Sequence, residues 1–293
     1  MRHWTGWVVY NKEDAQRNQE YIQWMLDEAQ ALGMTLRHVP REEIYVGIRS
    51  GHPAIWLANG LASAPDFVIV RTIEPILNAQ FEQLGIPTFN SAHVAHICNN
   101  KALTHQYLSQ FSVPMLDTLF TNTKYLETPG EALYPFPFVL KTVAGRGGKE
   151  VALIKNDRQL GAFVHDYPSS DVVVQALGPV TGKDIRVFVV GKRIVAAVLR
   201  HSPKDFRANI SLGGRPELYP MTEMQEALVR RIISHFDFGL VGIDFLLDSN
   251  GGLVFNEIED VVGSRSLSRV APNVNIVRTY LEFIHNRLEG VTN

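Results

Sequence analysis

Apolar and polar positions alternate in two ways along the first hundred residues. Short apolar runs at 7–10, 35–39 and 67–70 have the length and composition of strands. Across 14–32 the apolar residues recur at the spacing of an amphipathic helix, and another helix is expected after the third strand. Strands that alternate with helices are typical of an open parallel sheet. Residues 1–98 are therefore predicted to form an open α/β domain.

The pattern changes near residue 115. A helical stretch from about 91 to 111 leads to Val113-Pro114, where the residue before proline disfavours helix. The following elements are expected to be two strands flanking a glycine-rich turn between 138 and 150, a helix at 157–166, a strand at 171–175, a hairpin through Gly191-Lys192, a helix at about 222–235, a second hairpin and a closing helix at 273–288. This part of the chain is predicted to be α+β.

The second hairpin carries acidic residues on otherwise apolar strands. A turn centred on Asn250-Gly251 places Asp244 opposite Glu257, and the two-residue period of a strand puts Glu259 on the same face as Glu257. Carboxylates this close repel one another and resist ionisation unless a hard divalent cation such as Mg²⁺ compensates them. The three acids are a predicted metal site, and the alternative is a solvated hairpin end.

A lysine and several glycines mark the middle of the chain. Lys141 ends an apolar strand and is followed by Gly145, Gly147 and Gly148 before a second strand begins. Backbone N–H groups of such a turn can close over phosphates while the ammonium group binds the anion. The lysine precedes the glycines and no helix directly follows them, so this is not a Walker loop. The alternative is a structural β-turn.

Charged residues begin and end the apolar strands around Gly191-Lys192. Asp184, Arg186 and Arg200 are expected at the rim of a buried sheet, and Arg207 follows in a loop. Planar guanidinium groups in such places can clamp phosphate or carboxylate. Whether Arg186 and Arg200 share a face depends on a turn length that the sequence leaves open. Each arginine alone could be an ordinary surface charge.

Arg71 directly follows the strand at 67–70. It therefore lies at the carboxyl end of a parallel strand, where open α/β sheets bind their ligands. Arg71 is a candidate contact for a substrate carboxylate.

Composition limits the remaining possibilities. The chain has 293 residues, 45% hydrophobic and 20% charged, and a net charge of -2 with scattered basic residues, which gives no reason to expect a nucleic-acid or membrane partner. Its single cysteine, Cys98, fits a cytoplasmic protein without disulfides. No Ser-His-Asp or Cys-His arrangement stands out. His93, His96 and His105 are expected at the surface or at an interface.

In this order the motifs resemble the ATP-grasp superfamily, specifically carboxylate-amine ligases similar to the ribosomal-protein glutamate ligase and the lysine-biosynthesis ligases. The matching segments are Asn99-Asn100-Lys101, Lys141, the glycine turn, Gln175, 183–191, 205–209, Gly213-Gly214, Asp244 and Glu257. The resemblance implies an ATP-grasp fold: an N-terminal open α/β domain (1–98) and an ATP-grasp domain (99–293), with a small α+β lid subdomain at about 115–176 and a C-terminal antiparallel-sheet catalytic subdomain at about 177–293.

The resemblance also implies roles for individual residues. ATP would be bound by Lys101, Lys141, Gly145, Gly147, Gly148, Gln175, Ala176, Leu177 and Asp184. Mg²⁺, or alternatively Mn²⁺, would be held by Asp244, Glu257 and Glu259, and the catalytic residues would be Arg186, Arg200, Arg207 and Asn209. The chain departs from the family pattern at Glu259, where asparagine is usual, and at Ala176, where glutamate is common.

The implied reaction is ADP-forming ligation of a carboxylate to an amine through an acyl phosphate. The substrates would be small molecules or peptides, and a homo-oligomer is possible. Two other functions stay open: a nucleotide-binding module that regulates a partner without catalysis, and a phosphoryl-transfer enzyme that stops before ligation.

Overall fold

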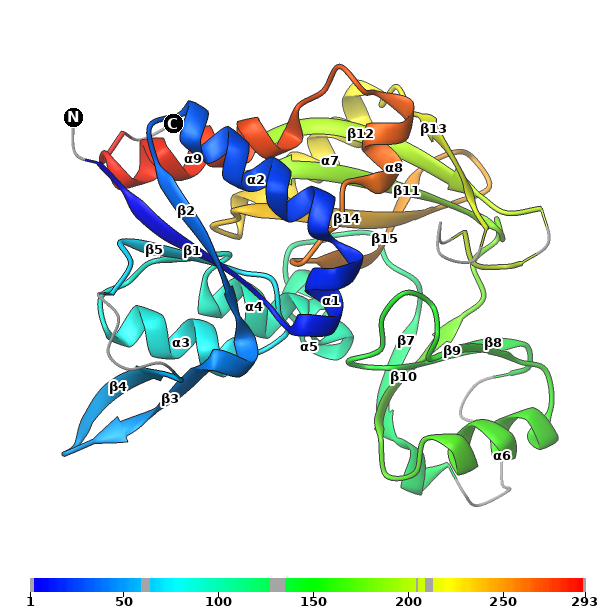
Figure 1. Ribbon diagram of the computed structural model, residues 1–293. Helices are drawn as coiled ribbons and strands as arrows, with labels where there is room; N and C mark the ends of the chain where they lie inside the picture. Colours follow the sequence, from blue (N-terminus) through cyan, green and yellow to red (C-terminus); the bar gives the residue numbers. More distant parts are fainter. Residues whose placement is uncertain (1–2, 59–63, 127–134, 204, 209–212, 292–293) are drawn as a thin grey trace.

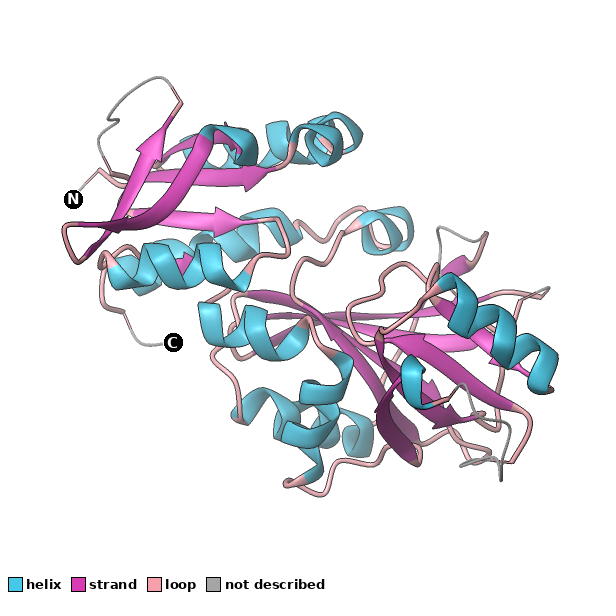
Figure 2. Cartoon of the chain, turned by 90° about the horizontal axis from the view of Figure 1, so that it is seen from below, coloured by secondary structure: helices cyan, strands magenta, loops and turns pink. Residues whose placement is uncertain are grey.

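The computed structural model describes residues 3–58, 64–126, 135–203, 205–208 and 213–291. Within these residues the strands form an N-terminal parallel sheet, two antiparallel sheets and a separate hairpin (Figures 1 and 2). The expected combination of an α/β unit with α+β units is confirmed. The boundaries of the three subdomains stay a prediction.

The N-terminal sheet is parallel, with strand order β2-β1-β5-β6. Its strands are β1 (Thr5–Tyr10), β2 (Thr35–Pro40), β5 (Phe67–Val70) and β6 (Thr88–Phe89), and its helices include α1 (Lys12–Arg17), α2 (Gln19–Ala31) and α3 (Pro75–Gln83). A 3₁₀ turn (Arg41–Glu43) leads into a hairpin of β3 (Ile44–Arg49) and β4 (His52–Leu57), which the sequence analysis missed. The four parallel strands end at one edge of the sheet, where ligands bind in such folds.

Two helices predicted as continuous are each interrupted by asparagine. The helix expected at 14–32 is divided at Asn18, whose side chain donates to the carbonyl oxygen of Asp14 at 2.7 Å. The stretch from 91 to 111 forms α4 (Ala92–Cys98) and α5 (Lys101–Ser109), and Asn100 caps α5 by accepting from the amide of Leu103. Asparagine side chains compete for backbone groups, so they favour caps over helix interiors.

The smaller antiparallel sheet has strand order β7-β10-β8-β9. Its elements are β7 (Thr118–Asn122), a 3₁₀ turn (Thr123–Tyr125), β8 (Phe138–Thr142), β9 (Val151–Ile154), α6 (Asp157–Asp166) and β10 (Asp171–Ala176). The bounds of α6 match the predicted helix. One face of this sheet packs against Phe163 of α6 to form a small core.

The larger antiparallel sheet has strand order β13-β12-β11-β14-β15. Its strands are β11 (Lys183–Val190), β12 (Arg193–His201), β13 (Arg215–Leu218), β14 (Leu240–Leu247) and β15 (Leu253–Glu259), and α7 (Glu223–Ser234), α8 (Arg265–Val270) and α9 (Ile276–Leu288) follow between and after them. On β11, Ile185 and Val187 are buried in a core shared with α4, α5 and α7. The alternation of a strand therefore turns Asp184 and Arg186 to the opposite face.

Helix α9, near the C-terminus, packs against the N-terminal unit. It lies beside α2 in Figure 1, and Asn275 at its start donates to Glu28 at 2.5 Å. Tyr280 and Leu281 of α9 share one core with residues of β1, β5 and β11. The N-terminal α/β unit is thereby packed against the larger antiparallel sheet, and the carboxyl end of the parallel sheet faces the segment after β15.

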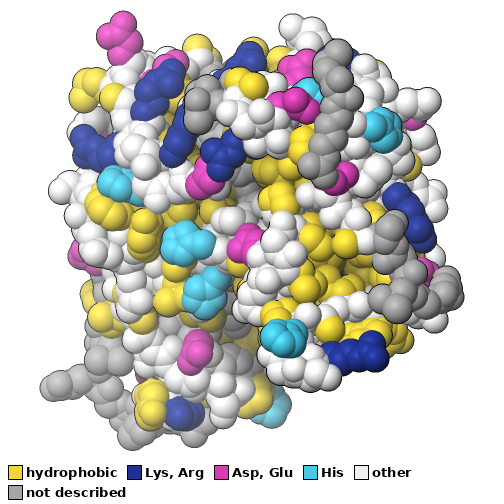
Figure 3. All heavy atoms as spheres, turned by 90° about the vertical axis from the view of Figure 1, so that its left-hand side faces the viewer, with side chains coloured by type: hydrophobic (Ala, Val, Ile, Leu, Met, Phe, Trp, Pro, Cys, Tyr) yellow, Lys and Arg dark blue, Asp and Glu magenta, His cyan; other side chains and the backbone are white. Residues whose placement is uncertain are grey.

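No helix within the described ranges is long and apolar enough to cross a membrane. On the face shown in Figure 3, basic and acidic side chains are interspersed.

Candidate functional site

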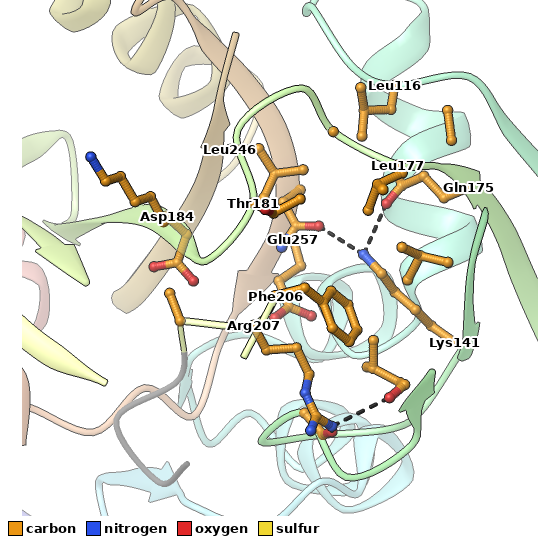
Figure 4. A pocket seen from close by; sticks show the side chains of 18 of the residues that line it. Leu116, Lys141, Gln175, Leu177, Thr181, Asp184, Phe206, Arg207, Leu246 and Glu257 are labelled. Carbon is orange, nitrogen blue, oxygen red and sulfur yellow. Dashed lines mark hydrogen bonds between the residues drawn. The ribbon is translucent and has the colours of Figure 1, made fainter. Parts of the chain in front are cut away.

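A pocket lies between the two antiparallel sheets (Figure 4). The empty space between its atoms, including the part open to solvent, is about 750 Å³. The lining residues are Lys101, Leu116, Val139, Lys141, Gly145, Gly147, Gly148, Val151, Gln175, Ala176, Leu177, Gly178, Val180, Thr181, Lys183, Asp184, Phe206, Arg207, Ala208, Leu246, Asn256 and Glu257.

One end of the pocket is apolar. Figure 4 shows Leu116, Leu177 and Leu246 gathered there, with the ring of Phe206 farther in. The segment at 175–177 supplies backbone next to these side chains. An apolar slot flanked by main-chain groups suits a flat heteroaromatic ring, because the side chains cover its faces and backbone groups can bond its edge.

The other end is basic. Lys141 Nζ donates to Gln175 Oε1 and to Asn256 Oδ1, each at 2.9 Å, and Lys101 Nζ lies 3.4 Å from Glu257. Burial lowers the pKa of Lys141 to about 8, with Glu257 opposing this effect and Lys101 adding to it. Its hydrogen-bond partners among the described residues, Gln175 and Asn256, are neutral, so the charge of Lys141 is available to a bound anion.

His105 fixes the orientation of this lysine through Gln175. Its Nδ1 lies 2.8 Å from the carbonyl oxygen of Lys101 and must donate to it, because a carbonyl oxygen can only accept. In the neutral ring Nε2 then carries no proton, so it accepts a hydrogen bond from the Gln175 amide nitrogen at 3.3 Å. Burial lowers the pKa of His105 to about 4, which keeps the ring neutral. The surface location expected for His105 is wrong: only 2% of the residue is exposed.

The glycine loop forms one wall. Gly147 and Gly148 have φ angles of 62° and 74°, and a Cβ on Gly145 would lie 2.5 Å from Thr142 Oγ1, so glycine is needed at all three positions. Arg207 anchors the loop, because its Nη1 donates to the carbonyl oxygens of Gly148 and of Val151.

An ion network lies beside the basic end. Arg186 donates through Nε and Nη2 to both carboxylate oxygens of Asp244, at 2.7 and 2.6 Å, and its Nη2 is 2.7 Å from Glu259. Arg200 donates to Asp184 at 2.5 Å and to Asp244 at 2.8 Å. Asp184 pairs with Arg200 along the β11–β12 ladder, so Arg186 and Arg200 do share a face.

These cations change the electrostatics expected of the acids. Burial alone would raise the pKa of Asp244, but Arg186 and Arg200 outweigh it and the pKa is lowered. Burial would also raise the pKa of Glu257, but Lys101, Lys141 and Arg186 together outweigh it and the pKa is lowered. For Asp244 and Glu257, the expectation of resistance to ionisation without a metal ion is therefore wrong. Asp184 in this network has a raised pKa, about 6, because burial and Asp244 together exceed the effects of Arg200 and Arg186.

The acids nevertheless fit a divalent cation. Asp244, Glu257 and Glu259 each offer a carboxylate oxygen within 4.8 Å of the others, which places three oxygen ligands around one point. The expected pairing of Asp244 with Glu257 is confirmed by the strand register, but the expected turn centred on Asn250-Gly251 is wrong. Leu247 pairs with Leu253, which centres the hairpin on Asn250, and a register shift beyond Phe245 restores the pairing.

The sequence analysis missed Asn256. The β14–β15 register shifts between Asp244 and Phe245, which pair with Glu257 and Phe255, so Asn256 is the extra residue of a bulge. Asn256 and its neighbour Glu257 consequently both line the pocket, although alternating residues of a regular strand point to opposite faces.

All nine residues expected to bind the nucleotide line the pocket, as do Arg207 and Glu257. Arg186, Arg200, Asp244 and Glu259 lie in the ion network rather than in the lining. Arg71 lies between the N-terminal sheet and the segment after β15, where it donates to the carbonyl oxygen of Val262. Asn209 lies outside the described residues. The roles expected for these residues stay predictions.

A family model, the RimK-like ATP-grasp domain, matches residues 98–284. A curated relative, the glutamate–LysW ligase ArgX of Sulfurisphaera tokodaii, is 28% identical over 216 residues, which cover 71% of this chain and 76% of that protein.

Solved structures share the fold. The RimK domain protein of Sphaerobacter thermophilus aligns with a TM-score of 0.73 at 18% identity and covers 95% of this chain and 98% of its own. The ATP-grasp ligase PsnB, complexed with Mg, ADP and a phosphomimetic variant of its minimal precursor, aligns with a TM-score of 0.67 at 16% identity over 100% of both chains.

Proposed function

Because this chain belongs to the RimK-like ATP-grasp family, we propose that it is an ADP-forming ligase that activates a carboxylate as an acyl phosphate and joins it to an amine. The observation that carries the proposal is one pocket whose apolar end suits a purine and whose basic end holds Lys101 and Lys141 beside Glu257.

The nucleotide is bound along the length of the pocket. Leu116, Leu177 and Leu246 cover the base, and the segment at 175–177 offers it backbone groups. The phosphates extend to Lys141 and Lys101, while the N–H groups of the glycine loop approach them from one side. Arg207, in the loop between β12 and β13, holds the glycine loop in place.

The reaction requires positioning and charge neutralisation rather than a side-chain nucleophile. A carboxylate oxygen of the donor attacks the γ-phosphorus, the bond to the β-phosphate oxygen breaks, and ADP leaves. The amine then attacks the acyl carbon, phosphate leaves, and the nitrogen loses a proton. Lys101 and Lys141 both line the pocket, where they can neutralise the phosphates in both steps.

Asp244, Glu257 and Glu259 are the residues placed to hold Mg²⁺, which when bound supplies Lewis-acid neutralisation of phosphate charge. Arg186 and Arg200 orient two of these carboxylates through the contacts of the ion network. In this arrangement they support the acids rather than contacting phosphate themselves.

The proposal is tested by an ADP-release screen of amino acids and dicarboxylic acids in pairs, with the product identified by mass. Addition of hydroxylamine in place of the amine should trap a hydroxamate. ADP release without a hydroxamate or amide would instead indicate a phosphoryl-transfer enzyme, and nucleotide binding without ADP release in any pair would indicate a regulatory module.

A further inference from the structure

Arg71 is a buried cation without an acidic partner. Only 7% of the residue is exposed, yet no carboxylate among the described residues forms a salt bridge with it. Its neighbours are tyrosines: Nε donates to Tyr10 Oη at 3.0 Å, and the guanidinium carbon lies 5.8 and 5.5 Å from the ring centroids of Tyr10 and Tyr21. Asp260 is near enough for Arg71 to lower its pKa, but its salt bridge, at 3.2 Å, is with Arg146.

A buried guanidinium without a counter-ion is costly unless an anion joins it. Nη2 donates to the carbonyl oxygen of Val262 at 2.7 Å, and with Tyr10 this contact fixes the plane of the group. Nη1 donates to no atom of the described residues, so one edge of the guanidinium is left without a partner there. The two nitrogens of that edge can bind both oxygens of one carboxylate.

The location of Arg71 connects it to the proposed reaction centre. It follows β5 at the carboxyl end of the parallel sheet, which Figure 1 shows pointing toward the centre of the molecule. Val262 contacts both regions. Its carbonyl oxygen accepts a hydrogen bond from Arg71, and its side chain packs against Gly242. A Cβ added at Gly242 would lie 2.7 Å from Val262 Cγ2 and 3.3 Å from the side chain of Arg186, so Arg186 is next to this contact. Arg71 and the ion network therefore flank the same short segment.

We propose that Arg71 binds a substrate carboxylate that is not the one activated. The ligand class is an amino acid or a dicarboxylic acid, held by its spare carboxylate at Arg71 while its other functional group reaches the reaction centre. Tyr10 is a positioning residue that aims the guanidinium. This inference rests on the proposed function for its meaning, but carboxylate binding at Arg71 can be measured without turnover.

The test is calorimetric titration of the protein saturated with Mg²⁺ and a nonhydrolysable ATP analogue. The probes are L-glutamate, L-aspartate and glutarate, and for L-glutamate also its two carboxamides, L-isoglutamine and L-glutamine. We expect at least one of the acids to bind at millimolar concentration or tighter, and one carboxamide of the bound acid to bind about 10- to 100-fold more weakly. If isoglutamine binds more weakly than glutamate, the α-carboxylate is the group bound by Arg71. If glutamine binds more weakly, the side-chain carboxylate is the group bound by Arg71.

Arg71→Met should abolish the difference in affinity between the acid and its carboxamide while leaving the affinity for the ATP analogue unchanged. Arg71→Lys keeps the positive charge but loses the second hydrogen bond, so it should reduce the affinity for the acid by less than Arg71→Met does. Arg37→Met, on an exposed position of β2 in the same sheet, is the matched control and should have no effect.

The proposal is overturned if no acid of the panel binds the wild-type protein, or if the carboxamide penalty is the same in the wild type and in both Arg71 variants. A protein that binds the acids through Arg71 but releases no ADP would contradict the proposed ligase activity while leaving this site intact.

Discussion

Arg186 and Asp244 form a two-pronged ion pair in the interior, with both carboxylate oxygens bonded at 2.7 and 2.6 Å. Around this pair, four basic side chains face four carboxylates: Lys101, Lys141, Arg186 and Arg200 against Asp184, Asp244, Glu257 and Glu259. The charges of this cluster balance before any ligand binds, and its cations lower the pKa of Asp244 and of Glu257, so these two acids do not need a metal ion to stay ionised.

Metal binding should consequently depend on the nucleotide. We expect Mn²⁺ to bind the free protein weakly and to bind at least about 10-fold more tightly when ADP is present, because only the phosphates add unneutralised negative charge. Electron paramagnetic resonance of free Mn²⁺ measures both affinities. In Glu257→Gln, ADP should increase the Mn²⁺ affinity by a smaller factor than in the wild type. Equal Mn²⁺ affinity with and without ADP would contradict the charge balance.

Lys141 should make nucleotide binding sensitive to pH. Its pKa is lowered to about 8, so the lysine is a cation below that pH and loses its charge above it. The dissociation constant of metal-free ADP should therefore rise as pH increases from 7 to 9.5. In Lys141→Ala this step should be absent and binding at pH 7 weaker by about 10- to 100-fold, the effect of a lost charged contact. A wild-type affinity that is constant across this range would place the lysine outside the phosphate site.

Glu257 and Glu259 should differ in importance. Glu257 lines the pocket, whereas Glu259 does not and is bonded to Arg186. We expect Glu257→Gln to lose nearly all activity at every Mg²⁺ concentration. Glu259→Gln should keep substantial activity but need more Mg²⁺, since it removes one negative charge from the cluster and leaves a polar oxygen in place. A Glu259→Gln enzyme with the wild-type Mg²⁺ dependence would remove Glu259 from the metal site.

Much of this site follows from sequence because its signals are local. The Asn-Gly turn and the apolar strands locate the acidic hairpin, and the lysine and glycines identify one wall of the pocket. The pairing of Asp244 with Glu257 is also predicted, but it depends on a bulge that compensates for a different turn register.

The remaining features depend on contacts between distant segments. The neutralisation of Asp244 requires β11, β12 and β14 to be neighbours in one sheet, which neither strand period nor composition reveals. The buried position of His105 depends on the packing of α5 against β10 and β15, and the role of Asn256 depends on a bulge. A bulge changes the face of every residue on one side of it, so a regular alternation cannot predict it.

Two tyrosines with buried hydroxyl groups should respond differently to loss of the hydroxyl. Tyr280 Oη donates to the carbonyl oxygen of Phe89 at 3.1 Å, whereas the buried Tyr21 Oη has no hydrogen-bond partner among the described residues. Tyr280→Phe should therefore lower the free energy of unfolding by about 1 to 2 kcal/mol, and Tyr21→Phe should leave it unchanged or raise it by up to about 1 kcal/mol. Urea denaturation of the matched pair measures both. Destabilisation by Tyr21→Phe equal to that of Tyr280→Phe would mean that the Tyr21 hydroxyl is bonded in the folded protein.

Activation of the carboxylate by phosphorylation can be tested by following its oxygen atoms. With a substrate pair identified by the ADP-release screen, the donor carboxylate is labelled with ¹⁸O and the released phosphate is analysed by mass spectrometry. An acyl phosphate transfers one labelled oxygen to inorganic phosphate when the amine displaces it. The account predicts ADP together with phosphate that carries one ¹⁸O atom. Labelled AMP with pyrophosphate as the second product, or phosphate free of label, would contradict it.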